Sequence, residues 1–162
     1  KYVPNPSEKL QLLAVRKNYD AIRFIKEPAA SVQEESVRIS YDALRYINSP
    51  TPAAELIAIK NNEVAKRLIN DLDKHKILEF LKVNFLVIKY VLRELSNDEV
   101  EQVLKEALGN EDVEEKYVRD YLNYSMIGKN SDIMPMDKIM FIYKYGSKKA
   151  KKIAVDEKLK LI

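Results

Sequence analysis

The strongest constraint on the fold is a pattern of side chains that recurs every 22 residues through the first half of the chain. Prolines mark its units at Pro6, Pro28 and Pro50. Five further columns each keep one kind of side chain through four units: Val15, Val37, Ile59 and Leu81; Ala21, Ala43, Ala65 and Val87; Phe24, Tyr46, Leu68 and Tyr90; Ile25, Ile47, Ile69 and Val91; and the polar Asn18, Ser40, Asn62 and Asn84. A fixed period of this length is typical of repeat proteins, in which each unit buries its apolar face against its neighbours. We therefore expect a stack of similar units.

Each unit is predicted to contain two short helices. Asn5-Pro6-Ser7-Glu8 is typical of a helix start, with Asn as the N-cap, Pro in the first turn and Glu placed to reach back. Leu10, Leu13 and Ala14 then follow at the spacing of an amphipathic helix. The polar column at Asn18 is expected to end this helix, because Asn tolerates the left-handed conformation and its side chain can cap the second helix.

Beyond the fourth unit the period loosens, and two further helix pairs are expected. A first helix should follow the cap signal Ser96–Glu99, with a partner over residues 112–122. Residues 123–134 are the least regular stretch, after which Pro135 is expected to reopen the pattern and Gly146-Ser147 to divide the last pair.

These patterns predict an all-α fold, an α-solenoid of stacked short helix pairs similar to HEAT repeats. Residues 1–93 form four regular repeats, and residues 94–162 form two diverged pairs that cap the same stack, as terminal repeats commonly do. Analogy with other helical repeats favours a right-handed arrangement. No strand is expected, because the β-branched residues fall at helical spacing.

The string NPSEKLQLLAVRKNYDAIRFIKEP at residues 5–28 resembles short repeats, with a consensus near NPSEEVQLAAVKQNGDAIRYIKNP, of uncharacterised bacterial and bacteriophage proteins. The likeness is close over residues 5–48, recognisable to about residue 70 and weak afterwards. Tyr19 and Tyr41 stand where the consensus has Gly, which argues against a left-handed turn at those positions. The resemblance implies an α-helical repeat fold and a bacterial or bacteriophage origin. It implies no activity, cofactor or catalytic residue.

Composition excludes several classes of protein. The chain has no Cys, one His and three Gly, so a disulfide scaffold, thiol catalysis, a Cys-based zinc site and a Gly-rich phosphate loop are all excluded. The longest apolar run, Phe85–Ile88, is far too short to span a membrane. We expect a cytoplasmic protein with no membrane partner, no metal and no cofactor. Lys1 in place of Met leads us to expect a chain that is processed or cut from a longer one.

No residues form a convincing catalytic group, so we predict that the chain is not an enzyme. His75 could be a metal ligand or a general base, but a surface or cap position is favoured, because a zinc site needs three or four ligands. Residues 94–120 carry ten acidic side chains against three basic ones, which indicates a solvated acidic face rather than an acid–base pair. Residues 103–122 resemble a helix-turn-helix in outline, but the Glu and Asp residues that open the second helix would repel DNA.

The basic residues form two columns and a basic end. The first column is Arg16, Arg38, Lys60 and Lys82, the second is Arg23, Arg45, Arg67 and Lys89, and the basic end is Lys148, Lys149, Lys151 and Lys152. Rows of cations could follow a phosphate backbone and give salt-sensitive binding that is independent of nucleotide sequence. Duplication alone would also repeat a surface residue. Asp20 and Asp42 stand three residues before Arg23 and Arg45, at a spacing that allows neutralising ion pairs.

The predicted function is a non-enzymatic binding module that recognises a protein partner. The residues favoured for this role are Arg23, Arg45 and Arg67 with Tyr19 and Tyr41. The alternative is a DNA- or RNA-binding domain that uses both basic columns and the lysine end. Tyr117, Tyr121 and Tyr124 share a helical face and could stack on bases, but packing between helices with the hydroxyl reaching water is the favoured role.

Overall fold

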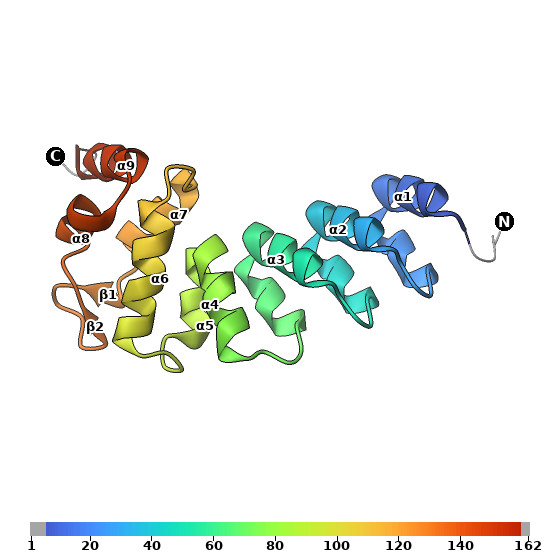
Figure 1. Ribbon diagram of the computed structural model, residues 1–162, viewed down its shortest axis with the longest axis horizontal. Coiled ribbons are helices and arrows are strands. Elements are labelled where there is room, and N and C mark those ends of the chain that lie inside the picture. The colour runs from blue at the N-terminus through green and yellow to red at the C-terminus, as the bar shows by residue number, and fades with distance from the viewer. Residues whose placement is uncertain (1–5, 160–162) are drawn as a thin grey trace. The chain divides into compact units, whose positions relative to one another are not determined.

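The computed structural model describes residues 6–159, which are mostly helical, and its short helices pack in chain order (Figure 1). The chain divides into two compact units, the first ending at Asp73 and the second starting at Lys74. The division at residue 93 was drawn from the sequence period alone and stays a prediction. No helix within residues 6–159 combines the length and the apolar character needed to cross a bilayer.

The first unit alternates α-helices with 3-10 helices. Its elements are α1 (Glu8–Lys17), η1 (Tyr19–Phe24), α2 (Ala30–Ile39), η2 (Tyr41–Tyr46), α3 (Pro52–Asn61) and η3 (Glu63–Leu68). Consecutive α-helices pack on each other, and so do consecutive 3-10 helices. Six residues of a 3-10 helix rise about 12 Å and ten residues of an α-helix about 15 Å, so the two helices of a pair nearly match in length.

The polar column joins the two helices of each pair in an extended conformation. Asn18, Ser40 and Asn62 have φ angles of −156°, −151° and −157°. Each side-chain oxygen accepts a hydrogen bond from the backbone N–H two residues later, at 3.1, 3.4 and 2.9 Å. The predicted cap is confirmed, and the predicted left-handed conformation is wrong, because a capping side chain reaches that N–H from an extended backbone. Among the described non-glycine residues only Asp71 has a positive φ, of 53°.

The core of the first unit is formed by the apolar columns. Val15, Val37 and Ile59 from the α-helices are fully buried. Ala43 and Ala65 from the 3-10 helices are also fully buried. Because these two side chains are small, η2 and η3 can approach the neighbouring elements closely.

The second unit contains longer and less regular elements. They are α4 (Lys74–Val83), η4 (Phe85–Val87), α5 (Ile88–Val91), α6 (Asn97–Gly109), α7 (Glu115–Asn123), β1 (Ile127–Gly128), β2 (Met134–Pro135), α8 (Lys138–Tyr145) and α9 (Lys148–Leu159). In this unit α6 packs on α4 and α8, while α7 packs on η4 and α9. The helices α6 and α7, which we expected to be partners, therefore make their main contacts with other helices.

Two short strands contradict the expectation of a fold without strands. Ile127 and Gly128 pair in parallel with Met134 and Pro135. Pro135 was expected to start a helix, but α8 begins three residues later, because the Asp137 side chain accepts a hydrogen bond from the Met140 N–H at 3.0 Å. An Asp is a far better N-cap than a residue that lies in a strand.

The predicted division of the last pair at Gly146-Ser147 is confirmed. The helix α8 ends at Tyr145, and the Ser147 hydroxyl accepts a hydrogen bond from the Ala150 N–H at 3.1 Å in the first turn of α9. A Cβ atom at Gly146 would lie 2.6 Å from the carbonyl oxygen of Ile142, so this position has room only for glycine.

An aromatic cluster forms the core of the second unit. The ring of Phe85 meets the rings of Tyr117, Tyr121 and Tyr124 edge-on, with centroid distances of 5.8, 5.6 and 5.6 Å. Packing between helices is thus confirmed for these tyrosines. The expectation that their hydroxyls reach water is wrong for Tyr117, whose hydroxyl donates to the carbonyl oxygen of Leu81 at 3.0 Å. Burial raises the pKa of Tyr117 and of Tyr121.

Candidate binding surface

The first basic column lies in the last turns of the α-helices, where cations complement the partial negative charge of a helix end. Arg16, Arg38 and Lys60 occupy these positions in α1, α2 and α3 and are exposed. Glu35 bridges the first two, with its carboxylate oxygens 2.8 Å from Arg16 Nε and 2.8 Å from Arg38 Nη1. The hydrogen bond from Arg16, with a further contribution from Arg38, lowers the pKa of Glu35. This column is therefore partly neutralised.

Sequence reasoning missed Glu35 as the residue that neutralises the first column. The spacing of three residues between Glu35 and Arg38 could have predicted the ion pair between these two residues. The pair with Arg16 joins adjacent units and depends on how α1 and α2 pack.

The second basic column lies at the ends of the 3-10 helices. Arg23, Arg45 and Arg67 are all exposed there. Arg45 Nε lies 2.9 Å from Asp42 Oδ1, and the hydrogen bond to this carboxylate raises the pKa of Arg45. The expected pair of Arg23 with Asp20 does not form within the described part of the chain. The guanidinium carbon of Arg23 instead lies 4.6 Å from the centre of the Phe24 ring.

These positions define what we call the arginine–aromatic surface, made of Tyr19, Arg23 and Phe24 from η1 and Tyr41, Arg45 and Tyr46 from η2. The two helices pack on each other, so the two sets of side chains are neighbours. The Phe24 side chain is 70% exposed, while Tyr19 and Tyr41 are half-buried. Phe24 and Tyr46 were recognised in sequence only as members of an apolar column, although each directly follows an arginine.

The aromatic character of this surface fades in the third pair. Arg67 continues the arginine column, but Glu63 and Leu68 replace the aromatic residues on either side of it. Exposed Arg, Tyr and Phe side chains are enriched at protein interfaces, since they offer large contact areas together with cations. The surface on η1 and η2 can thus accept both carboxylates and apolar groups.

The fourth members of the two columns, Lys82 and Lys89, belong to the second unit. Lys82 Nζ lies 2.8 Å from Glu79 Oε1 and 2.8 Å from Glu106 Oε2. The hydrogen bonds from these carboxylates, that of Glu106 first, raise the pKa of Lys82. Lys89 lies exposed in α5. Lys82 is therefore held in an ion-paired cluster between α4 and α6.

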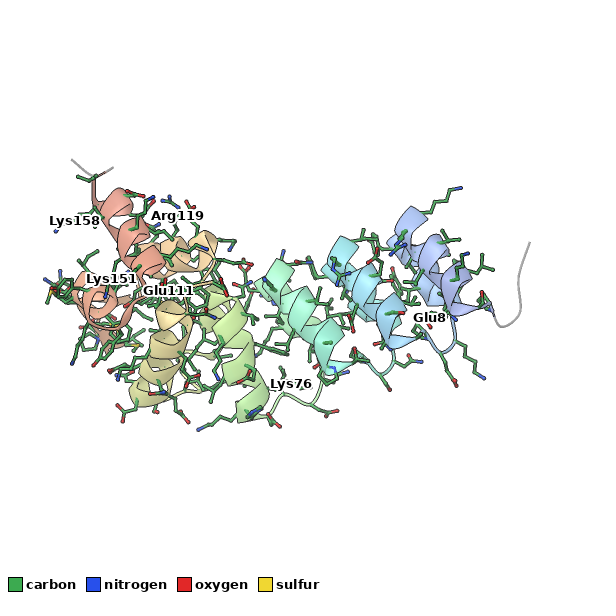
Figure 2. The ribbon with its side chains drawn as sticks, turned by 45° about the horizontal axis from the view of Figure 1, so that its top comes forward. Glu8, Lys76, Glu111, Arg119, Lys151 and Lys158 are labelled. Atoms are coloured by element: carbon green, nitrogen blue, oxygen red, sulfur yellow. The ribbon has the colours of Figure 1, made fainter. Side chains whose placement is uncertain are left out.

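The lysine end lies on α9. Lys148, Lys149, Lys151 and Lys152 are all exposed, and Figure 2 labels Lys151 on this helix. None of the four has a carboxylate within salt-bridge distance among residues 6–159. Two of them fall in the first turn of α9, where positive charge is unfavourable because the N-terminal end of a helix is itself positive.

The acidic segment is a solvated face, as expected. Glu111, Asp112, Glu114 and Glu115 are exposed around the start of α7. Arg119 forms ion pairs with Glu115 and with Glu157 of α9. Arg119 of α7 therefore balances a carboxylate of its own helix and one from α9, the helix that packs on it.

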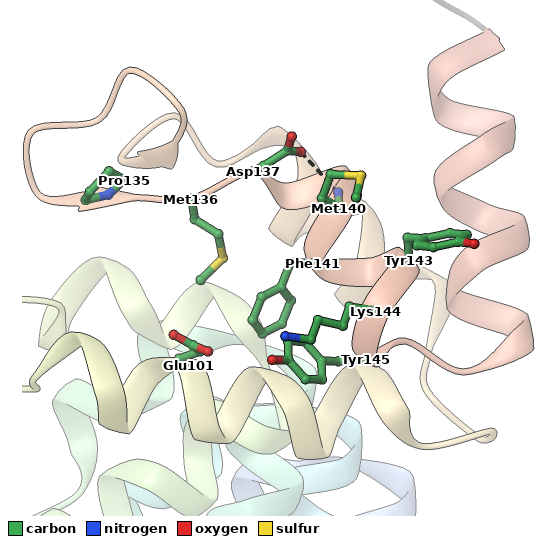
Figure 3. A pocket seen from close by; sticks show the side chains of 9 residues that line it. All are labelled: Glu101, Pro135, Met136, Asp137, Met140, Phe141, Tyr143, Lys144 and Tyr145. Carbon is green, nitrogen blue, oxygen red and sulfur yellow. Dashed lines mark hydrogen bonds between the residues drawn. The ribbon is translucent and has the colours of Figure 1, made fainter.

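A hollow lies beside α8, next to exposed aromatic side chains (Figure 3). It has a volume of about 470 Å³, and Met136, Met140 and Phe141 form much of its wall. Its two carboxylates are engaged by lysines, Glu101 by Lys105 and Asp137 by Lys129, at 2.8 Å each. The hollow thus presents apolar side chains with paired charges at its edge.

One half-buried lysine of the second unit, Lys138, has a structural role. Lys138 Nζ donates to the carbonyl oxygens of Tyr121, Leu122 and Tyr124 at 3.2, 2.6 and 2.8 Å. Its ammonium group therefore caps the C-terminal end of α7, where backbone carbonyls lack helical partners. Burial lowers the pKa of Lys138.

His75 lies exposed in the first turn of α4, in agreement with the predicted surface position. Within residues 6–159 no group of three or more His, Cys, Asp or Glu side chains is placed to hold a metal ion.

Comparison with protein-family models, with curated proteins and with solved structures finds no match for this chain. The likeness of residues 5–28 to short bacterial and bacteriophage repeats stays a statement about sequence. The surfaces described above must therefore be interpreted from their own chemistry.

Proposed function

We propose that the chain is an α-solenoid whose arginine–aromatic surface binds an acidic segment of a protein partner, without catalysing a reaction. The order of packing supports the solenoid. In the first unit the α-helices pack one on the next, and so do the 3-10 helices. In the second unit α4, α6 and α8 form one such series, and η4, α7 and α9 form the other. Solenoids of this kind present extended surfaces to their partners.

The observation that carries the proposed function is the exposed pair of Arg23 and Phe24. The Phe24 ring is 70% exposed and lies among the other Arg and Tyr side chains of the arginine–aromatic surface on η1 and η2, a combination that is enriched at protein interfaces. The guanidinium group over its face keeps a cation at the same place, and attraction between the two groups holds them together. On η2 the adjacent Arg45 and Tyr46 are also exposed, although Arg45 pairs with Asp42 instead of stacking on the ring. Carboxylates and apolar side chains of one partner segment can therefore be bound together.

Site-specific photocrosslinking tests this surface. A photoreactive phenylalanine analogue placed at Phe24 should capture a protein partner from a lysate of the source organism. The same analogue at Val155, which is exposed on α9, serves as the matched control. We expect a partner captured at Phe24 only, and its loss in the variant Arg23→Glu/Arg45→Glu/Arg67→Glu. Equal capture at both positions, or no capture at Phe24, would argue against the proposal.

The lysine end favours a second candidate function, binding of DNA or RNA independent of sequence. Four exposed lysines that have no carboxylate partner in the described part of the chain are suited to phosphate groups, and such binding weakens steeply with salt. The basic columns favour this function less, because Glu35, Asp42, Glu79 and Glu106 neutralise several of their members.

Titration with labelled duplex and single-stranded DNA and RNA at two salt concentrations separates the two functions. Binding that is lost in Lys148→Glu/Lys149→Glu/Lys152→Glu but kept in Arg23→Glu/Arg45→Glu/Arg67→Glu would assign nucleic-acid binding to α9. The two triple variants carry the same change in charge and so control for each other. Absence of binding at low salt would eliminate the second function and leave the protein-binding proposal untouched.

A further inference from the structure

In the first repeat one face is partly exposed, whereas the equivalent faces of the second and third repeats are buried. Leu10 of α1 is 41% exposed, while Val32 and Ala54 at the same column of α2 and α3 are completely buried. Ala14 and Ala21 are likewise half-buried, although their equivalents in the two following repeats are fully buried: Ser36, Ala58, Ala43 and Ala65. The difference arises because α2 and α3 each have a preceding repeat packed on this side, and no described element packs there on α1.

The uncovered face has the composition of an internal repeat. A terminal repeat normally carries a polar outer face, which keeps the end of the stack in water. The face of α1 instead presents Leu10, Ala14 and, at its edge, the 55% exposed Leu13. In the second repeat the column of Leu13 holds Glu35, which reaches back to Arg16 of the preceding repeat. Leu13, which holds the same position in the first repeat, therefore also lies on the side where a preceding repeat would pack.

The sequence ahead of the first repeat continues the columns. Lys1, Tyr2 and Val3 stand 22 residues before Arg23, Phe24 and Ile25 and match them in type. Arg45, Tyr46 and Ile47 match the same three positions one repeat later. A cation, an aromatic residue and a β-branched residue are thus kept in register on the N-terminal side of Asn5.

We propose that this face of α1 and η1 is a docking surface for one further 22-residue repeat, to which the sequence Lys1-Tyr2-Val3 belongs. In α2 and α3 the same columns contact the preceding helix, at the α1–α2 and α2–α3 interfaces. The docked repeat therefore contacts α1 with the face that α1 itself uses to contact α2. A second copy of the chain is a poorer fit, because the complementary faces of α1 and α2 are already covered by α2 and α3. This inference concerns a different surface from the arginine–aromatic surface and does not depend on the proposed function.

Duplication of one repeat tests the docking surface. A copy of residues 5–26 is inserted directly before Asn5 of the full chain, which keeps the 22-residue register. We expect Tm to rise by roughly 5 °C, since an added repeat contributes a new interface with its neighbour. Amide exchange in the original α1 should slow by about tenfold, because local opening of this helix would then break the new interface.

The same substitution in two places supplies the matched control. Leu10→Glu in the original repeat should abolish the rise in Tm, because the new carboxylate would be buried in the interface. Leu10→Glu in the inserted copy lies on the outer face and should leave the rise intact. The two proteins have the same composition and charge. An insertion that raises neither Tm nor protection, or equal effects of the two substitutions, would overturn the proposal.

Sedimentation of the unextended chain tests the competing occupant. We expect a monomer at micromolar concentration with and without Leu10→Glu. A dimer that Leu10→Glu dissociates would overturn the proposal and assign the face to a second copy of the chain.

Discussion

At the scale of the residue, one buried hydroxyl shows how much a single hydrogen bond matters in the second unit. The hydroxyl of Tyr117 donates to the Leu81 carbonyl oxygen in the interior. Tyr117→Phe leaves that oxygen buried without this donor, which should cost about 1–3 kcal/mol of unfolding free energy. Urea unfolding measures the loss. Tyr124→Phe is the control, because its hydroxyl lies near the surface, and an equal loss in both variants would contradict the assignment.

The ionised carboxylate of Glu99 should make stability depend on pH. Its oxygens accept a hydrogen bond from the Ser96 N–H at 2.8 Å and pair with Lys74 Nζ at 2.9 Å. The bond from Ser96 first, and then Lys74, lower the pKa of Glu99 from 4.5 to about 2. A lowered pKa in the folded state stabilises the protein above the unfolded pKa, and this contribution is lost as pH falls.

We therefore expect the wild type to be more stable than Glu99→Gln above about pH 4.5, with the difference shrinking as pH falls towards 2. Urea midpoints at pH 7, 4 and 3 measure it. Lys74→Met should move the loss to higher pH, because it removes one of the hydrogen bonds that lower the pKa. A difference between wild type and Glu99→Gln that stays constant down to pH 3 would contradict the prediction.

At the scale of the element, the polar column decides where each 3-10 helix begins. Asn62 accepts from the Val64 N–H at 2.9 Å while its backbone is extended. Asn62→Ala removes this cap and should cost about 1 kcal/mol, whereas Asn62→Ser should cost little, because Ser40 fills the same position in the second repeat. Thermal unfolding compares the two variants. Equal stability of Asn62→Ala and the wild type would show that the cap does not hold η3.

Several helix starts and ends were predictable because their causes are local, whereas the starts expected at Pro6 and Pro135 were wrong, since α1 begins at Glu8 and α8 at Lys138. A cap such as Ser96 with Glu99, or the division at Gly146-Ser147, depends on side chains and backbone groups within about four residues. The type of the second helix was not predictable in the same way. The pattern around Ala21 and Ile22 is compatible with an α-helix or a 3-10 helix, and the chain adopts the narrower, more extended 3-10 helix where neighbouring repeats pack.

At the scale of the whole molecule, we expect local opening first in the segment before α4. Residues 69–73 lie outside any helix, include Asp71 with its positive φ, and end where the first compact unit ends. The irregular stretch between α7 and α8 is held by the Gly128 carbonyl oxygen, which accepts from the N–H groups of Ser131 and Met136. Local opening is easiest where few such contacts must break.

Limited proteolysis with a protease that cuts before aspartate should therefore cleave first at Asp71 or Asp73. Two fragments that meet at this segment are expected, and mass spectrometry identifies their ends. Asp71→Asn/Asp73→Asn should leave the chain intact under the same conditions. First cleavage at Asp132 instead would place the weakest point in the segment between β1 and β2.

The sequence by itself determined the period, several of the caps and the faces of the helices, because each of these follows from side chains a few residues apart. It also brought the basic residues into columns. Only the tertiary structure decided which partner each of these basic side chains contacts. Glu35 reaches Arg16 from the next repeat, and Glu106 reaches Lys82 from another helix, whereas Arg23 stacks on Phe24. A long charged side chain has several partners within reach, and the packing of neighbouring elements selects among them.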